Sequence, residues 1–213
     1  MLVSHRYNFI YLKARKVAGT SIESYLQRYC LSPEKEKDFI MSHDTDFNMG
    51  KYGIVSARMG GQENWYWHNH KECIELKEQL GMNIWNNYTK ISSVRNPYDM
   101  MVSWFHFMTG YKGPQKDKFT SFIKNIKSHS LIIRNRNIWS ENGEFNFKYI
   151  RFENIEEDLK TIMNELGLPD YQVDLPHFKK SDRSQWRDYY TIETKNIVYK
   201  LFEKEINHFN YEF

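Results

Sequence analysis

The sequence predicts an α/β protein in which helices cover both faces of a central parallel sheet. Buried strands are predicted at residues 7–12, 88–94 and 147–152, where apolar residues run almost without interruption. Each strand is followed by a segment whose apolar residues recur with helical spacing, and this alternation is typical of a parallel sheet. The 213 residues show no obvious linker and no internal repeat, so a single domain spanning residues 1–213 is expected.

A short basic turn joins the first strand to the first helix. Phe9–Leu12 is the apolar run of the strand, and three basic residues follow it closely. Thr20 and Glu23 have the spacing of a capping box, which predicts that the helix begins at Thr20. The apolar face of this helix recurs at i, i+3, i+4 and i+7, and consists of Ile22, Tyr25, Leu26 and Tyr29.

The later elements follow from similar patterns. The stretch "YGIVSA" at residues 52–57 favours a short strand, and residues 71–80 predict a helix that Gly81 stops. The second long strand ends at "RNP", where Asn96 can cap a helix whose first residue is Pro97. Further helices are predicted at residues 97–108, 119–126, 155–166 and 191–206.

The composition disfavours several classes of protein. A formal net charge of +3 is too small for the basic stripe of a nucleic-acid-binding protein. No apolar run approaches the roughly 18 residues that a membrane span needs, and the amino-terminal apolar stretch is short, with charges on both sides, unlike a signal peptide. Cys30 and Cys73 are therefore expected to be buried thiols in a reducing compartment. We expect a soluble cytoplasmic protein without nucleic-acid or membrane partners; the sequence does not predict its oligomeric state.

The turn after the first strand is a candidate anion site. A strand that enters a helix through a tight turn directs free backbone amides to one point, where the helix dipole adds positive potential. Gly19 permits close approach of a ligand, and Thr20 and Ser21 add hydroxyl donors. The Walker and GxGxxG patterns are both absent, which disfavours an ordinary ATPase or dinucleotide site. The alternative is a capped helix with solvated basic residues, although three cations at a helix start repel one another without an anion. These cations are Lys13, Arg15 and Lys16.

The second candidate anion site follows the strand at residues 88–94. Arg95 ends this strand, and Ser103 lies two turns into the next helix. A guanidinium group that reaches over the helix start can bind one phosphate together with the serine hydroxyl, because its planar fork donates two hydrogen bonds to an oxyanion. The alternative for Arg95 is an ion pair with Asp99. Since both candidate sites follow parallel strands, they predict one ligand with two separate anionic groups.

The two segments resemble the cofactor motifs of sulfotransferases that use 3′-phosphoadenosine 5′-phosphosulfate (PAPS). The stretch "KARKVAGTS" at residues 13–21 is similar to the 5′-phosphosulfate loop of that family. The stretch "VRNPYDMMVSW" at residues 94–104 is similar to its 3′-phosphate motif, with an arginine and a serine eight residues apart. Three more stretches resemble the glycan-type branch: "HKECIELKEQLGMNIWNNYTKISSVRNP", "YIRFENIEEDL" and "FEKEINHFNYEF". The resemblance covers most of the chain and is weakest at residues 31–61.

The resemblance implies a P-loop-NTPase-like three-layer sandwich. It also implies an enzyme that transfers a sulfuryl group from PAPS, as co-substrate, to an acceptor hydroxyl, in line and without a metal. The chain departs from many relatives at Arg15, where proline is common, and at Val17, where threonine is common. By resemblance, Lys16 stabilises the leaving phosphate, and the 5′-phosphosulfate is bound by Ala18, Gly19, Thr20 and Ser21. The resemblance assigns Arg95 and Ser103 to the 3′-phosphate. It places Arg183 in a loop that closes over the nucleotide.

Sulfuryl transfer to a hydroxyl needs a general base, and the stretch "WYWHNHKE" offers two histidines. His70 fits better than His68, because relatives often carry a histidine just before the helix that follows. In a strand-like stretch the two side chains share a face, so either is a candidate. The alternatives are a zinc site that combines both histidines with Cys73, or two surface histidines.

The acceptor is expected to be a carbohydrate, because the resemblance is nearer to the glycan branch than to the branch that acts on small phenols. Trp65, Tyr66 and Trp67 could stack on sugar rings, or could simply pack a lid. Two other functions remain as alternatives. One is a P-loop-type nucleotide-dependent kinase, which the missing GK[ST] disfavours, and the other is a non-catalytic nucleotide-binding module.

Overall fold

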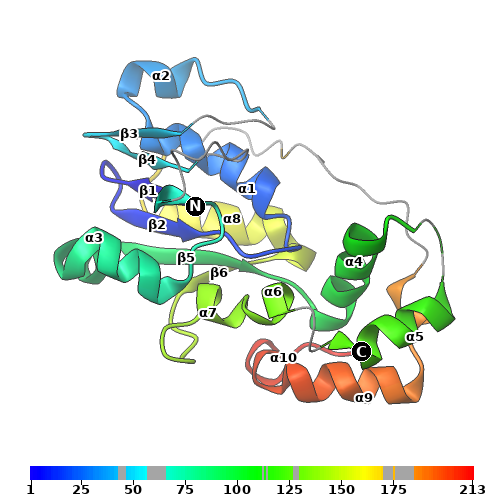
Figure 1. Cartoon of the computed structure of the whole chain (residues 1–213). Helices are drawn as coiled ribbons and strands as arrows, with labels where there is room; N and C mark the ends of the chain where they lie inside the picture. Colours follow the sequence, from blue (N-terminus) through cyan, green and yellow to red (C-terminus); the bar gives the residue numbers. More distant parts are fainter. Residues whose placement is uncertain are drawn as a thin grey trace. The chain divides into compact units, whose positions relative to one another are not determined.

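The computed structural model describes residues 1–42, 47–56, 66–111, 113, 115–126, 130–169, 175 and 185–213, except for the side chains of Ser130 and Leu131. The chain divides into two compact units (Figure 1). Unit 1 consists of Met1–Val94 and Asn135–Phe178, and unit 2 consists of Arg95–Arg134 and Lys179–Phe213. Unit 1 contains the sheet, and unit 2 is helical in its described part.

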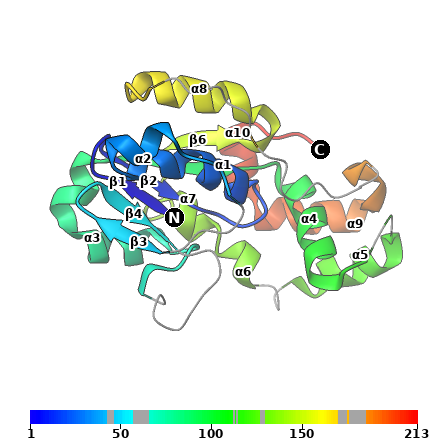
Figure 2. The ribbon, with the colours of Figure 1, turned by 90° about the horizontal axis from the view of Figure 1, so that it is seen from above.

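The sheet of unit 1 has the strand order β3-β4-β1-β2-β5-β6. The expected parallel arrangement holds for β2, β5 and β6, which pair in parallel. It is wrong for the other half of the sheet, where β1 pairs antiparallel with β2 and β4, and β3 pairs antiparallel with β4 (Figure 2). β1 and β2 form one hairpin, β3 and β4 form another, and the two hairpins meet where β1 pairs with β4. The strands are β1 (Leu2–Ser4), β2 (Phe9–Leu12), β3 (Asn48–Gly50), β4 (Gly53–Val55), β5 (Thr89–Val94) and β6 (Lys148–Arg151).

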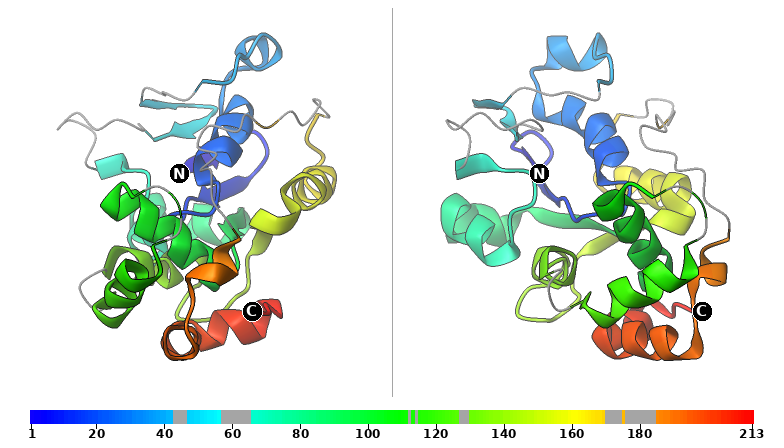
Figure 3. Two further views of the ribbon diagram at one scale, coloured as in Figure 1. Left: turned by 90° about the vertical axis from the view of Figure 1, so that its right-hand side faces the viewer. Right: turned by 45° about the vertical axis from the view of Figure 1, so that its right-hand side comes forward.

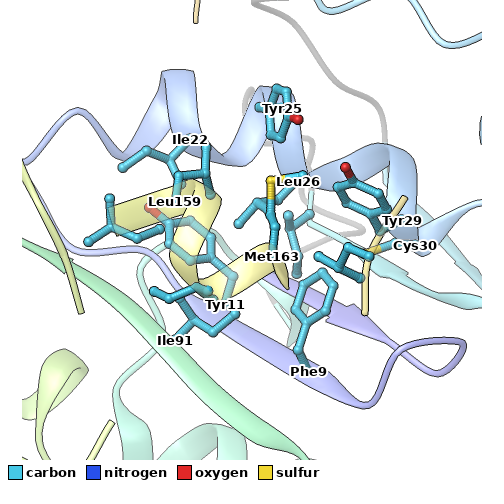
Figure 4. Close-up of a cluster of buried hydrophobic side chains, with 14 of the residues drawn as sticks. Phe9, Tyr11, Ile22, Tyr25, Leu26, Tyr29, Cys30, Ile91, Leu159 and Met163 are labelled. Carbon is cyan, nitrogen blue, oxygen red and sulfur yellow. The ribbon is translucent and has the colours of Figure 1, made fainter. Parts of the chain in front are cut away.

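Helices cover both faces of this sheet, so the predicted layering is confirmed (Figure 1). On one face, α1 (Gly19–Leu26) and α8 (Ile155–Glu165) enclose a core with Phe9, Tyr11 and Ile91 of the strands (Figure 4). On the other face lie α3 (Cys73–Asn87) and α7 (Arg136–Trp139). Three short helices connect these elements: η1 (Gln27–Cys30), α2 (Pro33–Lys37) and η4 (Phe152–Asn154).

Helix α3 differs from its prediction at Gly81. The residue has φ 78° and ψ 158°, which interrupts the helix as expected of a stop. Helical turns resume after this kink and continue to Asn87. Leu76 before the kink and Trp85 after it are both fully buried, so packing against the rest of unit 1 holds both halves of the helix.

Unit 2 consists of helices packed around aromatic side chains. In Figure 3 the orange segment of η5 and α9 lies beside the green α4 and α5. The predicted start of α4 is confirmed, since the Asn96 side chain accepts a 3.0 Å hydrogen bond from the Tyr98 amide and Pro97 is the first helical residue. Phe202, with φ −120°, splits the predicted last helix in two. The helices are α4 (Pro97–Thr109), α5 (Lys116–Lys124), α6 (Ser130–Ile133), η5 (Trp186–Tyr189), α9 (Ile192–Leu201) and α10 (Glu203–Phe209).

Candidate active site

The turn between β2 and α1 has the backbone of an anion-binding loop. Lys16 and Ala18 have φ angles of 64° and 59°, in the left-handed region, and Val17 between them does not. Such alternation points successive N–H groups into one concavity, which can hold an anion. The amides of Gly19 and Thr20 add to this concavity, because they come before Ser21, whose amide donates to the Ala18 carbonyl oxygen at 3.0 Å. The predicted strand–turn–helix unit is confirmed.

Gly19 is required by close packing at the start of α1. A Cβ atom at this position would lie 2.9 Å from Cγ of Lys13 and 3.1 Å from the carbonyl oxygen of Ala14. The second contact is with the backbone and cannot relax by a change of rotamer. Glycine therefore allows the helix start to sit directly on the Lys13 side chain.

The predicted capping box of Thr20 and Glu23 is wrong. Helix α1 starts at Gly19 with Ala18 as the N-cap, and no side chain caps it. Glu23 is fully buried instead, and its Oε2 accepts a 2.6 Å hydrogen bond from Nζ of Lys13. A buried ammonium group needs a partner of opposite charge, and this need outweighs a cap. Of the three cations in the turn, Lys13 is thus matched inside the protein, while Arg15 and Lys16 are only half-buried.

Asn135, the first residue of the second chain segment of unit 1, fixes the loop backbone. Its Oδ1 accepts from the amide of Arg15 at 2.9 Å, and its Nδ2 donates to the Arg15 carbonyl oxygen, also at 2.9 Å. The side chain is fully buried. Asn135 lies 120 residues from Arg15 and belongs to no recognisable motif, so this role could not be predicted from residue type or spacing.

His70 lies against the same loop. Its Nδ1 is 2.9 Å from the carbonyl oxygen of Lys13. Because a carbonyl oxygen only accepts, Nδ1 carries the proton and Nε2 is left as the acceptor. Burial, together with the charges of Arg15 and Lys13, lowers the pKa of His70 to about 3. The imidazole is therefore neutral near pH 7, as a general base must be.

His68 has a different environment. Its Nε2 is 3.9 Å from Oε2 of Glu75, and 37% of its side chain is exposed. Burial lowers its pKa, and the charge of Lys71 acts in the same direction. No zinc cluster forms with His70 and Cys73, since no group of three His, Cys, Asp or Glu side chains within the described ranges is placed to hold a metal. Burial also raises the pKa of the Cys73 thiol to about 12.

Of the described aromatic residues before these histidines, Tyr66 presents an exposed ring. Tyr66 is 61% exposed and packs edge-to-face with Trp67, with ring centroids 5.3 Å apart. Trp65 lies outside the described residues, and so does Arg183.

In unit 2, Arg95 is buried and paired with Asp99. Its Nε donates to Oδ2 of Asp99 at 2.8 Å, and its Nη2 contacts the same oxygen. The ion pair that the sequence left open is therefore present. Ser103 is half-buried on α4, one turn after Asp99, so Arg95, Asp99 and Ser103 follow one another at intervals of four residues.

The family model described as the sulfotransferase family matches residues 1–212. The chain belongs to the sulfotransferase family. No curated protein matches the chain. Membership of the sulfotransferase family confirms the family predicted from the two motifs, and with the layered sheet it confirms the P-loop-like α/β fold. In the part of this sulfotransferase that the structure describes, no helix is both long and apolar enough to cross a membrane.

The lowered pKa of His70 predicts how the stability of this sulfotransferase depends on pH. Between pH 6.5 and about 3 the unfolded chain binds a proton at this histidine and the folded chain does not, so the free energy of unfolding falls as the pH falls. From pH 7 to pH 5 the loss is expected to be about 2 kcal/mol. Urea unfolding at pH 7 and pH 5 gives the change in the free energy of unfolding for each protein. This change should be about 2 kcal/mol smaller in His70→Gln than in the wild type. Equal losses in the two proteins would contradict the assignment of a buried neutral imidazole.

Proposed function

We propose that this sulfotransferase transfers a sulfuryl group from PAPS to a hydroxyl group of a carbohydrate, with His70 as the general base and Lys16 as the cation that stabilises the leaving phosphate. One observation carries this proposal. The Nδ1 atom of His70 is hydrogen-bonded to the carbonyl of Lys13, three residues before Lys16, which ties the candidate base to the candidate anion loop. The whole chain, residues 1–213, would act as one sulfotransferase domain.

The proposed reaction is a single in-line displacement. As the acceptor oxygen bonds to sulfur, its proton passes to Nε2 of His70, and the bond between sulfur and the 5′-phosphate oxygen breaks. The electron pair stays on the 5′-phosphate, where Lys16 and the amides of Gly19 and Thr20 stabilise the added charge. The products are the sulfated acceptor and 3′-phosphoadenosine 5′-phosphate. The hydroxyl groups of Thr20 and Ser21 would donate to the same phosphate, beside the backbone of Ala18.

The low pKa of His70 is consistent with this role. Arg15 and Lys13 contribute to the lowering through their positive charges. An anionic donor bound in the loop would offset those charges and raise the pKa of His70 toward the range in which a base works best. The base would therefore become stronger when the donor is bound.

The carbohydrate acceptor is the finer part of the proposal. Its support is the exposed ring of Tyr66, which precedes His68 and His70 closely in the chain and can stack on the apolar face of a sugar. A screen of glycan, phenol and peptide acceptors with sulfur-35-labelled PAPS tests this point. Label in glycans supports it, whereas label only in phenols or tyrosine peptides would contradict the carbohydrate acceptor and leave sulfuryl transfer in place.

The donor is tested by thermal shift with 3′-phosphoadenosine 5′-phosphate, ATP with Mg²⁺, and GTP. At 100 times its Kd, a ligand stabilises the folded chain by about 2.7 kcal/mol, which for a protein of this size raises Tm by roughly 5–10 °C. We expect this shift with 3′-phosphoadenosine 5′-phosphate alone. A shift with ATP and Mg²⁺ instead would indicate a kinase. Binding of the first ligand without any sulfuryl transfer would indicate a non-catalytic module.

We further propose that Arg95 and Ser103 bind the 3′-phosphate, so the same assay is informative for variants in α4. Arg95→Ala should abolish most of the shift, since it removes the guanidinium group. Asp99→Asn is the matched variant, and it should keep or increase the shift because it removes a carboxylate that competes with the phosphate for Arg95. An undiminished shift in Arg95→Ala would contradict this assignment.

A further inference from the structure

Glu23 joins several segments of unit 1 through one buried carboxylate. None of its surface is exposed. Its Oε2 accepts from Nζ of Lys13, and its Oε1 accepts from the amino group of Met1, both at 2.6 Å. The hydroxyl of Ser56 is 3.5 Å from Oε1. Helix α1 thus supplies the carboxylate that pairs with the ammonium groups of Lys13 and Met1.

Of these partners, Lys13 contacts His70 itself, and Ser56 and Met1 contact the residue before it. The carbonyl oxygen of Lys13 is the acceptor for Nδ1 of His70, at 2.9 Å. On the other side, the Ser56 hydroxyl is 2.6 Å from Oδ1 of Asn69, the residue that precedes His70. The amino group of Met1 donates to the Asn69 carbonyl oxygen at 3.2 Å. Lys13, whose ammonium group contacts Glu23, therefore holds the imidazole through its carbonyl, and Ser56 and Met1 hold the preceding residue, Asn69.

We infer that Glu23 and Lys13 are positioning residues for the base His70, an inference that rests on the proposed function. The ion pair fixes the Lys13 side chain, on which Gly19 packs. It therefore also fixes the position of the Lys13 carbonyl oxygen. That carbonyl holds the proton on Nδ1 and directs the Nε2 lone pair. Glu23 does not touch substrate, because it is fully buried.

The inference predicts that Glu23→Gln releases the imidazole. A glutamine side chain offers one acceptor oxygen to two ammonium groups, so one of the contacts from Lys13 and Met1 is lost. Nitrogen-15 NMR of the histidines separates protonated from unprotonated ring nitrogens. We expect His70 to carry its proton on Nδ1 in the wild type and to show a mixture of tautomers in Glu23→Gln. The kcat for sulfuryl transfer should fall roughly tenfold or more, with the KM for PAPS changed little.

Glu36→Gln is the matched control. Glu36 is also a buried carboxylate in an ion pair, with Arg6, and it lies on α2. Its loss should lower stability but leave the His70 tautomer and kcat unchanged. If Glu23→Gln fails to fold, the double variant Lys13→Met/Glu23→Gln also removes the Lys13 charge, so the glutamine oxygen has one ammonium group left to accept from, that of Met1. The same change of tautomer is expected in it.

Each outcome decides a separate point. A wild-type tautomer and kcat in folded Glu23→Gln, or in the folded double variant, overturns the inference. A proton on Nε2 of His70 in the wild type also overturns it. If the tautomer depends on Glu23 but no acceptor is ever sulfated, the positioning of the imidazole is supported and the proposed function is what fails.

Discussion

Replacing His70 by alanine is expected to slow sulfuryl transfer by roughly 10²–10⁴-fold, the usual contribution of a general base. The acceptor oxygen would then have to lose its proton to water. Binding of 3′-phosphoadenosine 5′-phosphate should persist, because His70 contacts the loop through the Lys13 carbonyl and leaves the loop amides unchanged. The measurement is kcat with labelled PAPS and a glycan acceptor, together with the thermal shift.

His68→Ala is the matched control for this experiment. Its imidazole faces Glu75 at 3.9 Å and is more than one-third exposed. We expect its kcat to stay within a few-fold of the wild-type value. If His68→Ala shows the large loss and His70→Ala does not, the base is His68 and the two histidines exchange roles.

Lys16→Met is expected to lower kcat by roughly 10²–10³-fold, the effect of removing one preorganised group that stabilises transition-state charge. The loss should appear mainly in kcat, since the charge on the 5′-phosphate grows only as its bond to sulfur breaks. Methionine is unbranched and one atom shorter than lysine and, like lysine, has a Cβ at the left-handed position, so the backbone cost is similar.

Lys16→Arg provides the comparison. It keeps the positive charge and the same backbone requirement, and it should retain much more activity than the methionine variant. Equal activity of Lys16→Met and the wild type would remove Lys16 from the mechanism. Equal loss in Lys16→Met and Lys16→Arg would point to packing of the loop as the cause.

The parts of the site that follow from local spacing were predicted from the sequence. The apolar run of Phe9–Leu12, the small residues after it and the helical period from Ile22 are neighbours in the chain, so their pattern encodes the loop. Asn96 and Pro97 are a second local signal, and their capping geometry matches the prediction. The roles of Arg95, Ser103 and the two histidines remain predictions.

The contacts that hold the site together could not be predicted, because they join distant residues. The Thr20–Glu23 spacing is that of a capping box, yet the carboxylate turns inward to the buried Lys13. The double hydrogen bond of Asn135 to Arg15 and the acceptor of His70 both involve backbone atoms, for which residue type gives no signal. In such cases tertiary burial decides between partners that are locally equivalent.

Strand β1 shows why the antiparallel pairing was missed. Leu2–Ser4 is too short for its period to be recognised, although both of its partners, β2 and β4, lie within predicted strands. At Gly81 the local stop signal does end the first helical segment, but it does not predict the second segment, which the burial of Trp85 holds in place.

The left-handed backbone of Lys16 and Ala18 affects when the donor loop acquires its order. A residue with a side chain costs roughly 1–2 kcal/mol in this conformation, and the two residues meet that cost as the chain folds. A phosphate that arrives later finds amides already turned toward it and loses little conformational entropy. If the loop binds the donor as proposed, the free energy that these two residues cost in folding would reappear as a smaller entropic cost of binding the nucleotide.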